Sequence, residues 1–131
     1  MTLSIVPFYA AVLALVLVAL SVRVIGLRRR KGVALGTRRD IELVRATRAH
    51  ANFVEYVPMA LLLLSFVEMI YPPQFVHVLG IALIVGRLAH AYEVSREPED
   101  FRYRMTDMSL TFTVLAGASL LIIASTLARF A

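Results

Sequence analysis

Long apolar stretches alternate with short polar ones along the chain. Residues 3–22, 70–86 and 108–128 contain no charged side chain. A helix that crosses about 30 Å of hydrocarbon at about 1.5 Å per residue needs roughly 20 apolar residues. Each of these stretches therefore predicts a membrane-spanning helix.

A further apolar stretch differs because ionisable and amide side chains run directly into it. Its uncharged part, residues 56–67, is too short to cross the hydrocarbon alone. The helix must then carry Glu55, Asn52 and Arg48 below the lipid surface. An ionisable side chain at that depth costs about 2.5 kcal/mol or more and usually faces a protein interior or a polar cavity. We therefore expect any functional site to lie here.

Together these stretches predict a single all-α integral membrane domain. The hydrophobic share of the 131 residues is 60%, above the roughly 45 to 50% of soluble domains. Pro58 is expected to loosen or kink the second helix, and the Pro72 and Pro73 pair to end it. Short connections predict a four-helix up-down bundle. The predicted spans are residues 3–27, 41–70, 75–94 and 107–129.

The net charge of +5 is unevenly distributed. The connection after the second span contains no Lys or Arg, whereas the other two connections are basic. By the positive-inside rule, the basic loops are cytoplasmic and both termini lie outside. The basic run indicates topology and contact with lipid headgroups, and we expect no nucleic-acid partner. The basic residues are Arg28, Arg29, Arg30, Lys31, Arg38 and Arg39 in the first loop, and Arg96, Arg102 and Arg104 in the second.

One face of the second span collects polar side chains. At about 100° per residue, Asn52, Glu55 and Tyr56 fall within about 80° of Arg48 around the helix axis. This face lies in the third of the span nearest the basic loops. It is therefore the predicted binding surface.

Neighbouring spans bring further donors to the same depth. Arg28 ends the first span, and Arg87 and His90 lie near the end of the third. Arg102 or Arg104 begins the return into the membrane. We include Arg28, Arg87 and His90 among the candidate binding residues.

Such a pocket suits a zwitterionic ligand with excess negative charge. Arginine binds carboxylates through two parallel hydrogen bonds, and Glu55 is suited to an ammonium group. The tripeptide glutathione has two carboxylates, one ammonium and a thiol. An arginine near the thiol would stabilise the reactive thiolate, while the bilayer delivers an apolar electrophile.

At these residues the chain resembles the membrane-associated proteins in eicosanoid and glutathione metabolism, the MAPEG family, which includes the microsomal glutathione transferases. Gly86-Arg87-Leu88 in the third span and the arginine pair ending the first support the resemblance. It covers nearly the whole chain, with four spans in the same order. The main match is Arg48-Ala49-x-x-Asn52-x-x-Glu55-Tyr56-x-Pro58.

The resemblance implies a homotrimer that binds glutathione, as co-substrate, between subunits near the cytoplasmic face. Carried over by position, one arginine early in the fourth span polarises the thiol. Arg104 is preferred to Arg102 for this catalytic role, although the acidic stretch Glu97-Pro98-Glu99-Asp100 leaves the register open. The residues implied to bind glutathione are Arg28, Arg48, Asn52, Glu55 and Tyr56.

The end of the third span departs from the glutathione-using relatives. Those proteins have two tyrosines one turn apart, where this chain has His90 and Val94. The departure resembles a less-characterised bacterial branch of the family. It favours an integral protein of the bacterial inner membrane, and it leaves open whether the chain is an enzyme.

Three functions fit these observations. The first is a glutathione-dependent membrane transferase or peroxidase that acts on lipophilic electrophiles or lipid hydroperoxides. The alternative is a non-catalytic membrane binding or interaction protein on the same trimeric scaffold. A third is a small transporter or ion-conducting oligomer with Glu55 as its gated charge.

The same polar residues also have structural interpretations. Arg48 and Glu55 could form an internal salt bridge, and Asn52 could be an interhelical hydrogen-bonding residue. Arg87 could pair with Glu55 or Glu93 instead of with a ligand.

The absence of cysteine and the spacing of the histidines exclude cysteine thiol chemistry and a metal site. The chain has no cysteine, so a cysteine nucleophile and a thiolate metal site are excluded. His50 lies off the polar face and is expected to be a packed or interfacial residue, and His77 lies near the opposite membrane face. The three histidines lack the spacing of a metal site, so we expect no metal.

Overall fold

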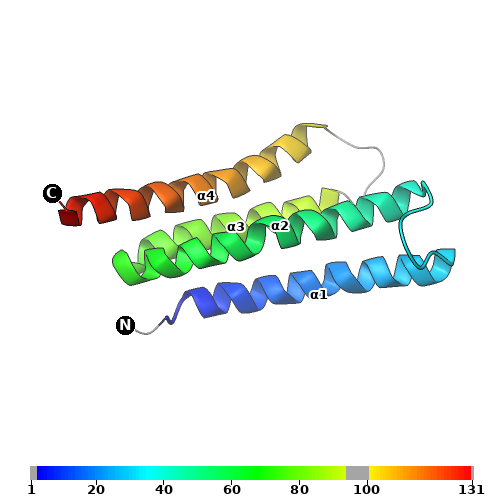
Figure 1. Cartoon of the computed structure of the whole chain (residues 1–131), viewed down its shortest axis with the longest axis horizontal. Helices are drawn as coiled ribbons and strands as arrows, with labels where there is room; N and C mark the ends of the chain where they lie inside the picture. Colours follow the sequence, from blue (N-terminus) through cyan, green and yellow to red (C-terminus); the bar gives the residue numbers. More distant parts are fainter. Residues whose placement is uncertain (1–2, 94–100, 131) are drawn as a thin grey trace.

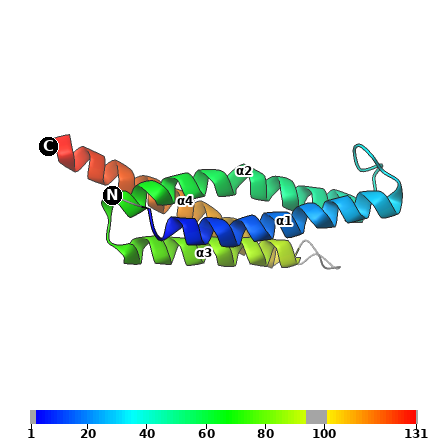
Figure 2. The ribbon, with the colours of Figure 1, turned by 90° about the horizontal axis from the view of Figure 1, so that it is seen from below.

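The structure, a computed structural model, describes residues 3–93 and 101–130, with side chains described for residues 3–92 and 108–130. This part of the chain forms four α-helices that lie side by side and alternate in direction, so that both termini lie at one end (Figures 1 and 2). All four are long and apolar enough to cross a membrane. The predicted four-helix membrane bundle is confirmed. The helices are α1 (Val6–Lys31), α2 (Ile41–Ile70), α3 (Pro73–Glu93) and α4 (Phe101–Phe130).

The first and last helices extend beyond their predicted bounds. Helix α1 continues through the basic run to Lys31, because cations are favourable at the C-terminus of a helix. Gly32, with φ of 63°, ends it in the left-handed conformation typical of a C-terminal cap. At 26 residues, α1 is about 39 Å long. Its last turn therefore extends past a hydrocarbon core of about 30 Å.

The core of the bundle forms along one stripe of α2. The buried side chains recur every three or four residues, as expected for a helix with one packed face. Pro58 is exposed, and α2 passes through it without interruption. Large apolar side chains outside the core, such as Leu15 and Val78, are exposed as lipid-facing residues would be. The buried stripe consists of Leu43, Ala46, Ala49, Phe53, Val57, Ala60, Leu64 and Val67.

At the end of the bundle that carries the termini, Glu68 of α2 caps the start of α1. Its Oε1 accepts hydrogen bonds from the backbone N–H groups of Ser4 (2.6 Å) and Ile5 (2.7 Å). Its Oε2 accepts one from the N–H of Val6 at 2.7 Å. These first N–H groups have no partner within their own helix, and a carboxylate is favourable beside them. A side chain distant in sequence therefore replaces a local cap.

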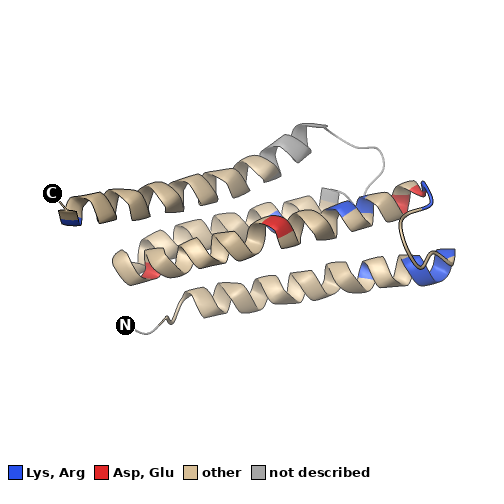
Figure 3. Cartoon of the chain, viewed as in Figure 1, with Lys and Arg blue, Asp and Glu red and all other residues tan. Residues whose placement is uncertain are grey.

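The opposite end carries most of the basic residues (Figure 3). There, Lys31 Nζ donates to Asp40 Oδ2 at 2.6 Å, and Asp40 Oδ1 accepts from the Leu43 N–H at 2.8 Å. The Lys31 hydrogen bond, followed by that of Leu43, holds the pKa of the Asp40 carboxyl below its usual range. Asp40 therefore stays ionised near neutral pH and joins α1 to the start of α2.

The connection between α1 and α2 contains a strained turn. Arg38 and Arg39 have φ of 45° and 60°. The left-handed conformation costs a residue with a Cβ about 1 to 2 kcal/mol. The contacts that flank the turn must therefore compensate for this backbone strain.

Helices α1 and α3 approach closely where Tyr9 lies over Gly80. The Tyr9 hydroxyl is 2.9 Å from His77 Nδ1, and the Tyr9 ring is buried. A Cβ built on Gly80 would lie 2.8 Å from two carbon atoms of the Tyr9 ring, closer than real Cβ contacts. Gly80 therefore sets the separation of the two helices.

We expect the substitution Gly80→Ala to lower the free energy of unfolding by about 1 to 3 kcal/mol, because the added methyl group overpacks the contact with Tyr9. Thermal unfolding of the purified protein in detergent measures the change. Gly26→Ala is the matched control, since nothing lies within 4 Å of a Cβ there. That variant should be neutral or stabilised by up to about 1 kcal/mol. Equal stability of the two variants would contradict the close approach.

Candidate functional site

A buried guanidinium group connects three helices at the level of the predicted site. The Arg87 side chain of α3 is 1% exposed. Its Nη1 donates to Asn52 Oδ1 of α2 at 2.7 Å, and its Nη2 donates to Thr111 Oγ1 of α4. We call Asn52, Arg87 and Thr111 the polar triad. Because buried arginine must satisfy its donors, these contacts fix how the three helices pack.

The triad also orients the amide of Asn52. With Oδ1 accepting from Arg87, the Asn52 Nδ2 group donates to Met108 Sδ at 3.4 Å. One turn further along α2, the Tyr56 ring packs edge-to-face against Phe112, with ring centroids 5.5 Å apart. Two of the predicted binding residues are therefore held by α4. The prediction of Asn52 as an interhelical hydrogen-bonding residue is confirmed.

The charged members of the α2 face are exposed. Arg48 and Glu55 lie on the surface of the isolated chain. Figure 3 colours a short acidic segment of the ribbon red, midway along α2. The ion pairs found in the described part of the chain join Lys31 or Arg30 to acidic residues at the start of α2. The internal salt bridge between Arg48 and Glu55 considered from the sequence is not formed.

Arg28 lies apart from the triad. Its Nη1 donates to the backbone carbonyls of Ala34 (3.2 Å) and Gly36 (2.9 Å) in the connection between α1 and α2. This arginine therefore stabilises the loop of its own chain. Within one chain, the structure does not bring it to Asn52.

The remaining candidates come from α3 and α4. His90 is buried, with 8% of its surface exposed, and lies one turn after Arg87. Arg104, the predicted catalytic residue, and Arg102 belong to the first turn of α4, where the side chains lie outside those that the structure describes. Val94 also lies outside the described residues.

The other two histidines have structural contacts. His50 Nε2 is 3.1 Å from Ser21 Oγ, which joins α2 to α1 and confirms His50 as a packed residue. His77 contacts Tyr9, as described above. Among the side chains of residues 3–92 and 108–130, no group of three or more histidine or acidic residues is placed to hold a metal ion.

Thr111 is the functional candidate that sequence reasoning missed. It is fully buried and shares Arg87 with Asn52. A hydroxyl within an apolar span is a signal for an interhelical hydrogen bond. Residues 108–128 contain several serines and threonines, however, so the sequence alone does not identify the one that faces Arg87.

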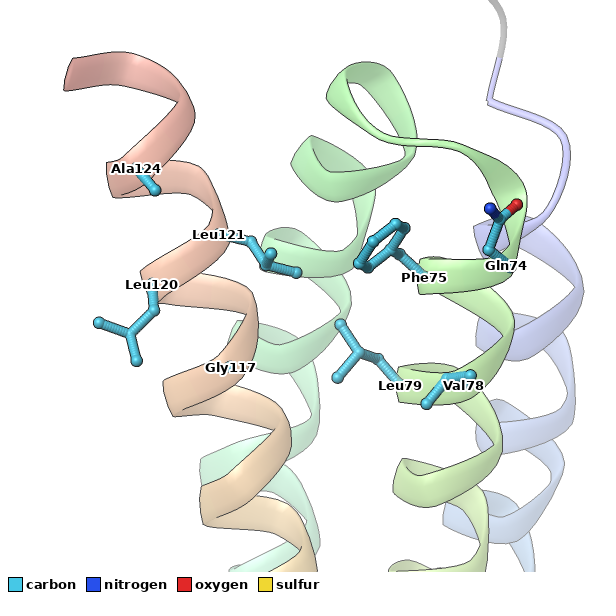
Figure 4. Close-up of a pocket in the computed structure, with 8 residues that line it drawn as sticks. All are labelled: Gln74, Phe75, Val78, Leu79, Gly117, Leu120, Leu121 and Ala124. Atoms are coloured by element: carbon cyan, nitrogen blue, oxygen red, sulfur yellow. The ribbon is translucent and has the colours of Figure 1, made fainter. Parts of the chain in front are cut away.

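An apolar groove of about 590 Å³ lies between α3 and α4, toward the end that carries the termini (Figure 4). Gln74 is its single polar lining residue. The groove therefore suits hydrocarbon and has no charged group with which to bind a peptide. Its other lining residues are Phe75, Val78, Leu79, Gly117, Leu120, Leu121 and Ala124.

Comparison with known proteins shows to which family the chain belongs. The inner membrane protein YecN of Escherichia coli K12 is 41% identical over 108 residues, which are 82% of this chain and 81% of YecN. YecN of Escherichia coli O6:H1 matches with the same identity and coverage. The family model described as MAPEG family matches residues 6–124. The chain belongs to the MAPEG family.

Proposed function

We propose that this protein is a glutathione-dependent transferase or peroxidase of the bacterial inner membrane. Its substrates would be lipophilic electrophiles or lipid hydroperoxides, and its working form a homotrimer. Membership of the MAPEG family and the similarity to an inner membrane protein support this assignment. We also propose that the basic loops face the cytoplasm and that the termini lie outside.

The observation that carries the proposal is the exposure of Arg48 and Glu55 on a membrane helix. A charged side chain facing lipid costs about 2.5 kcal/mol or more. Both charges therefore require cover in the membrane. A second copy of the chain would exclude lipid from this face, and a bound zwitterion would neutralise the charges. A glutathione site between subunits meets both requirements.

The groups on this face match those of glutathione. Arg48 would bind a carboxylate of the tripeptide, and Glu55 its ammonium. Asn52 is already oriented by Arg87 at 2.7 Å, so its amide requires little reorganisation on binding. Tyr56 supplies a hydroxyl on the same face. In the proposed trimer, Arg28 of a neighbouring copy would contribute a further cation.

The proposed chemistry needs a thiolate close to the bilayer. Arg104 would stabilise the glutathione thiolate electrostatically. In the transferase reaction, the sulfur would donate an electron pair to an electrophilic carbon of the substrate, and the leaving group would depart with the electron pair of the broken bond. The bilayer would deliver apolar substrates directly to the sulfur.

A non-catalytic binding protein on the same scaffold is the second candidate. It is favoured by His90, which is buried where the glutathione-using relatives have a tyrosine. A buried imidazole has no phenolic hydroxyl to donate to a thiolate. Such a protein would bind glutathione without activating its thiol.

Calorimetric titration of the detergent-purified protein with glutathione tests the proposal. Because each variant loses a charge-assisted contact of about 1.5 to 3 kcal/mol, Arg48→Ala and Glu55→Gln should each weaken binding by about tenfold or more. Arg129→Gln, an exposed arginine at the far end of α4, is the control and should bind as the native protein does.

Ultraviolet absorbance of the bound thiolate then separates the two candidates. A thiolate signal supports the enzyme, whereas binding without it supports the non-catalytic protein. No binding at millimolar glutathione, or equal binding by Arg48→Ala and the native protein, would contradict the assigned site.

A further inference from the structure

The turn between α1 and α2 presents two arginines in an unfavourable backbone conformation. The Asp40 N–H donates to the Thr37 carbonyl at 2.9 Å, and φ is positive at both Arg38 and Arg39. This combination is typical of type I′ turns, in which Asn-Gly is the preferred central pair. Arginine has a Cβ that crowds the backbone there. Because strained residues cluster at functional sites, the conformation of this turn indicates a function for both arginine side chains.

The rest of the loop holds this turn in place. Val33 is buried against the base of α1 and α2. Arg28 Nη1 donates to the Gly36 carbonyl at 2.9 Å, and Lys31 Nζ donates to Asp40 Oδ2 at 2.6 Å. Both flanks of the turn are thus fixed by contacts that the two central arginines do not make.

Arg38 and Arg39 remain available for an external partner. Both are exposed, and neither belongs to the ion pairs seen in residues 3–92 and 108–130. The acidic residues nearest in sequence, Asp40 and Glu42, already contact Lys31 at 2.6 and 3.0 Å. The turn is therefore a preformed pair of cations.

The position of the loop indicates which anion it meets. Helix α1 is longer than the hydrocarbon core is thick, which places the loop at the level of the lipid headgroups. Leu35 is 88% exposed and Ile41 is 63% exposed, on either side of the turn. Apolar side chains at this level favour contact with the boundary between headgroups and acyl chains. Phosphate groups of the surrounding bilayer are present there at high effective concentration.

We propose that Arg38 and Arg39 form a docking site for the headgroup phosphate of an anionic phospholipid. Guanidinium groups bind phosphate oxygens through paired hydrogen bonds, and an anionic lipid surface attracts them electrostatically. The need for both arginines in lipid binding then explains why this turn keeps a strained backbone, as other functional turns do. The inference does not depend on the proposed use of glutathione, because neither arginine belongs to that site.

The test compares phospholipid binding by full-length variants in detergent, using native mass spectrometry with phosphatidylglycerol and, as zwitterionic control, phosphatidylcholine. Arg38→Asn combined with Arg39→Gly removes both cations and supplies the residues that the turn prefers. We expect this double variant to bind phosphatidylglycerol at least tenfold more weakly and to unfold at a temperature several degrees higher. Binding of phosphatidylcholine should not change.

Two further double variants separate the turn from charge in general. Arg29→Gln with Arg30→Gln removes two cations from the same end of the molecule, and its affinity for phosphatidylglycerol should fall less than threefold. Arg38→Lys with Arg39→Lys keeps the charge but loses the paired hydrogen bonds, so its affinity should be intermediate.

Several results would overturn the proposal. One is native-like phosphatidylglycerol binding by the Asn-Gly double variant, and another is an equal loss in the Arg29 and Arg30 double variant. A lower unfolding temperature for the Asn-Gly double variant would remove the argument from strain. Inorganic phosphate that displaces phosphatidylglycerol at equal concentration would show a general anion site instead of a lipid site.

Discussion

Replacing Arg87 with methionine is expected to lower the free energy of unfolding by about 2 to 4 kcal/mol, because Asn52 and Thr111 each lose a buried hydrogen-bond partner. The affinity for glutathione should fall about tenfold or more, since the Asn52 amide is no longer oriented. Thermal unfolding in detergent and calorimetric titration of the same sample measure the two effects.

The matched control is Thr111→Val, which removes the hydroxyl but leaves the contact between Arg87 and Asn52. Its destabilisation should be smaller, about 1 to 2 kcal/mol. Its affinity for glutathione should stay within threefold of the native value. Native affinity in Arg87→Met would show that Asn52 does not need Arg87 for its role. An equal loss of affinity in Thr111→Val would assign the effect to packing of the helices.

Replacing Arg104 with alanine is expected to reduce turnover about 100- to 1,000-fold, the usual effect of removing one electrostatic stabiliser of a reacting anion. Binding of glutathione should change less than threefold, because Arg48 and Glu55 provide the main contacts in the proposed site. The ultraviolet signal of the bound thiolate should disappear. Conjugation of a lipophilic electrophile by the reconstituted protein measures the turnover.

Arg102→Ala is the control, since it removes the same charge from the same turn of α4. Its turnover and thiolate signal should match those of the native protein. If Arg102→Ala loses turnover instead, the residue that stabilises the thiolate is Arg102 and not Arg104. Full turnover in Arg104→Ala would remove its assignment as the residue that stabilises the thiolate.

The helices could be predicted from the sequence because their signals are local. Apolar stretches of sufficient length and the Pro72 and Pro73 pair give the four spans to within a few residues, apart from the earlier start of α4. The cap at the start of α1 could not be predicted in the same way. In the sequence, Glu68 is a charged residue near the end of a span with no local sign of a capping role. That role depends on where Ser4 and Val6 lie in the folded protein.

The candidate site was predicted in part for the same reason. The spacing of Arg48, Asn52 and Glu55 gives one face of a helix, which needs no knowledge of the neighbouring helices. Arg87 contacts Asn52 and Thr111 because of how α3 and α4 are rotated about their own axes relative to α2. The periodicity of a single helix does not predict that rotation. The exposure of Arg48 and Glu55 likewise depends on which face of α2 the other helices cover.

The contacts between the first two helices bear on the order in which the protein forms during synthesis. Two of these contacts, Val6 with Glu68 and Ser21 with His50, join α1 to α2. A third joins Lys31 at the end of α1 to Asp40, the N-terminal cap of α2. Chains are synthesised at about 5 to 20 residues per second, and N-terminal parts fold first. We expect this helical hairpin to be complete in the membrane while α4 is still on the ribosome. The polar face of α2, with Arg48, Asn52 and Glu55, therefore exists before Thr111 is synthesised and completes the polar triad.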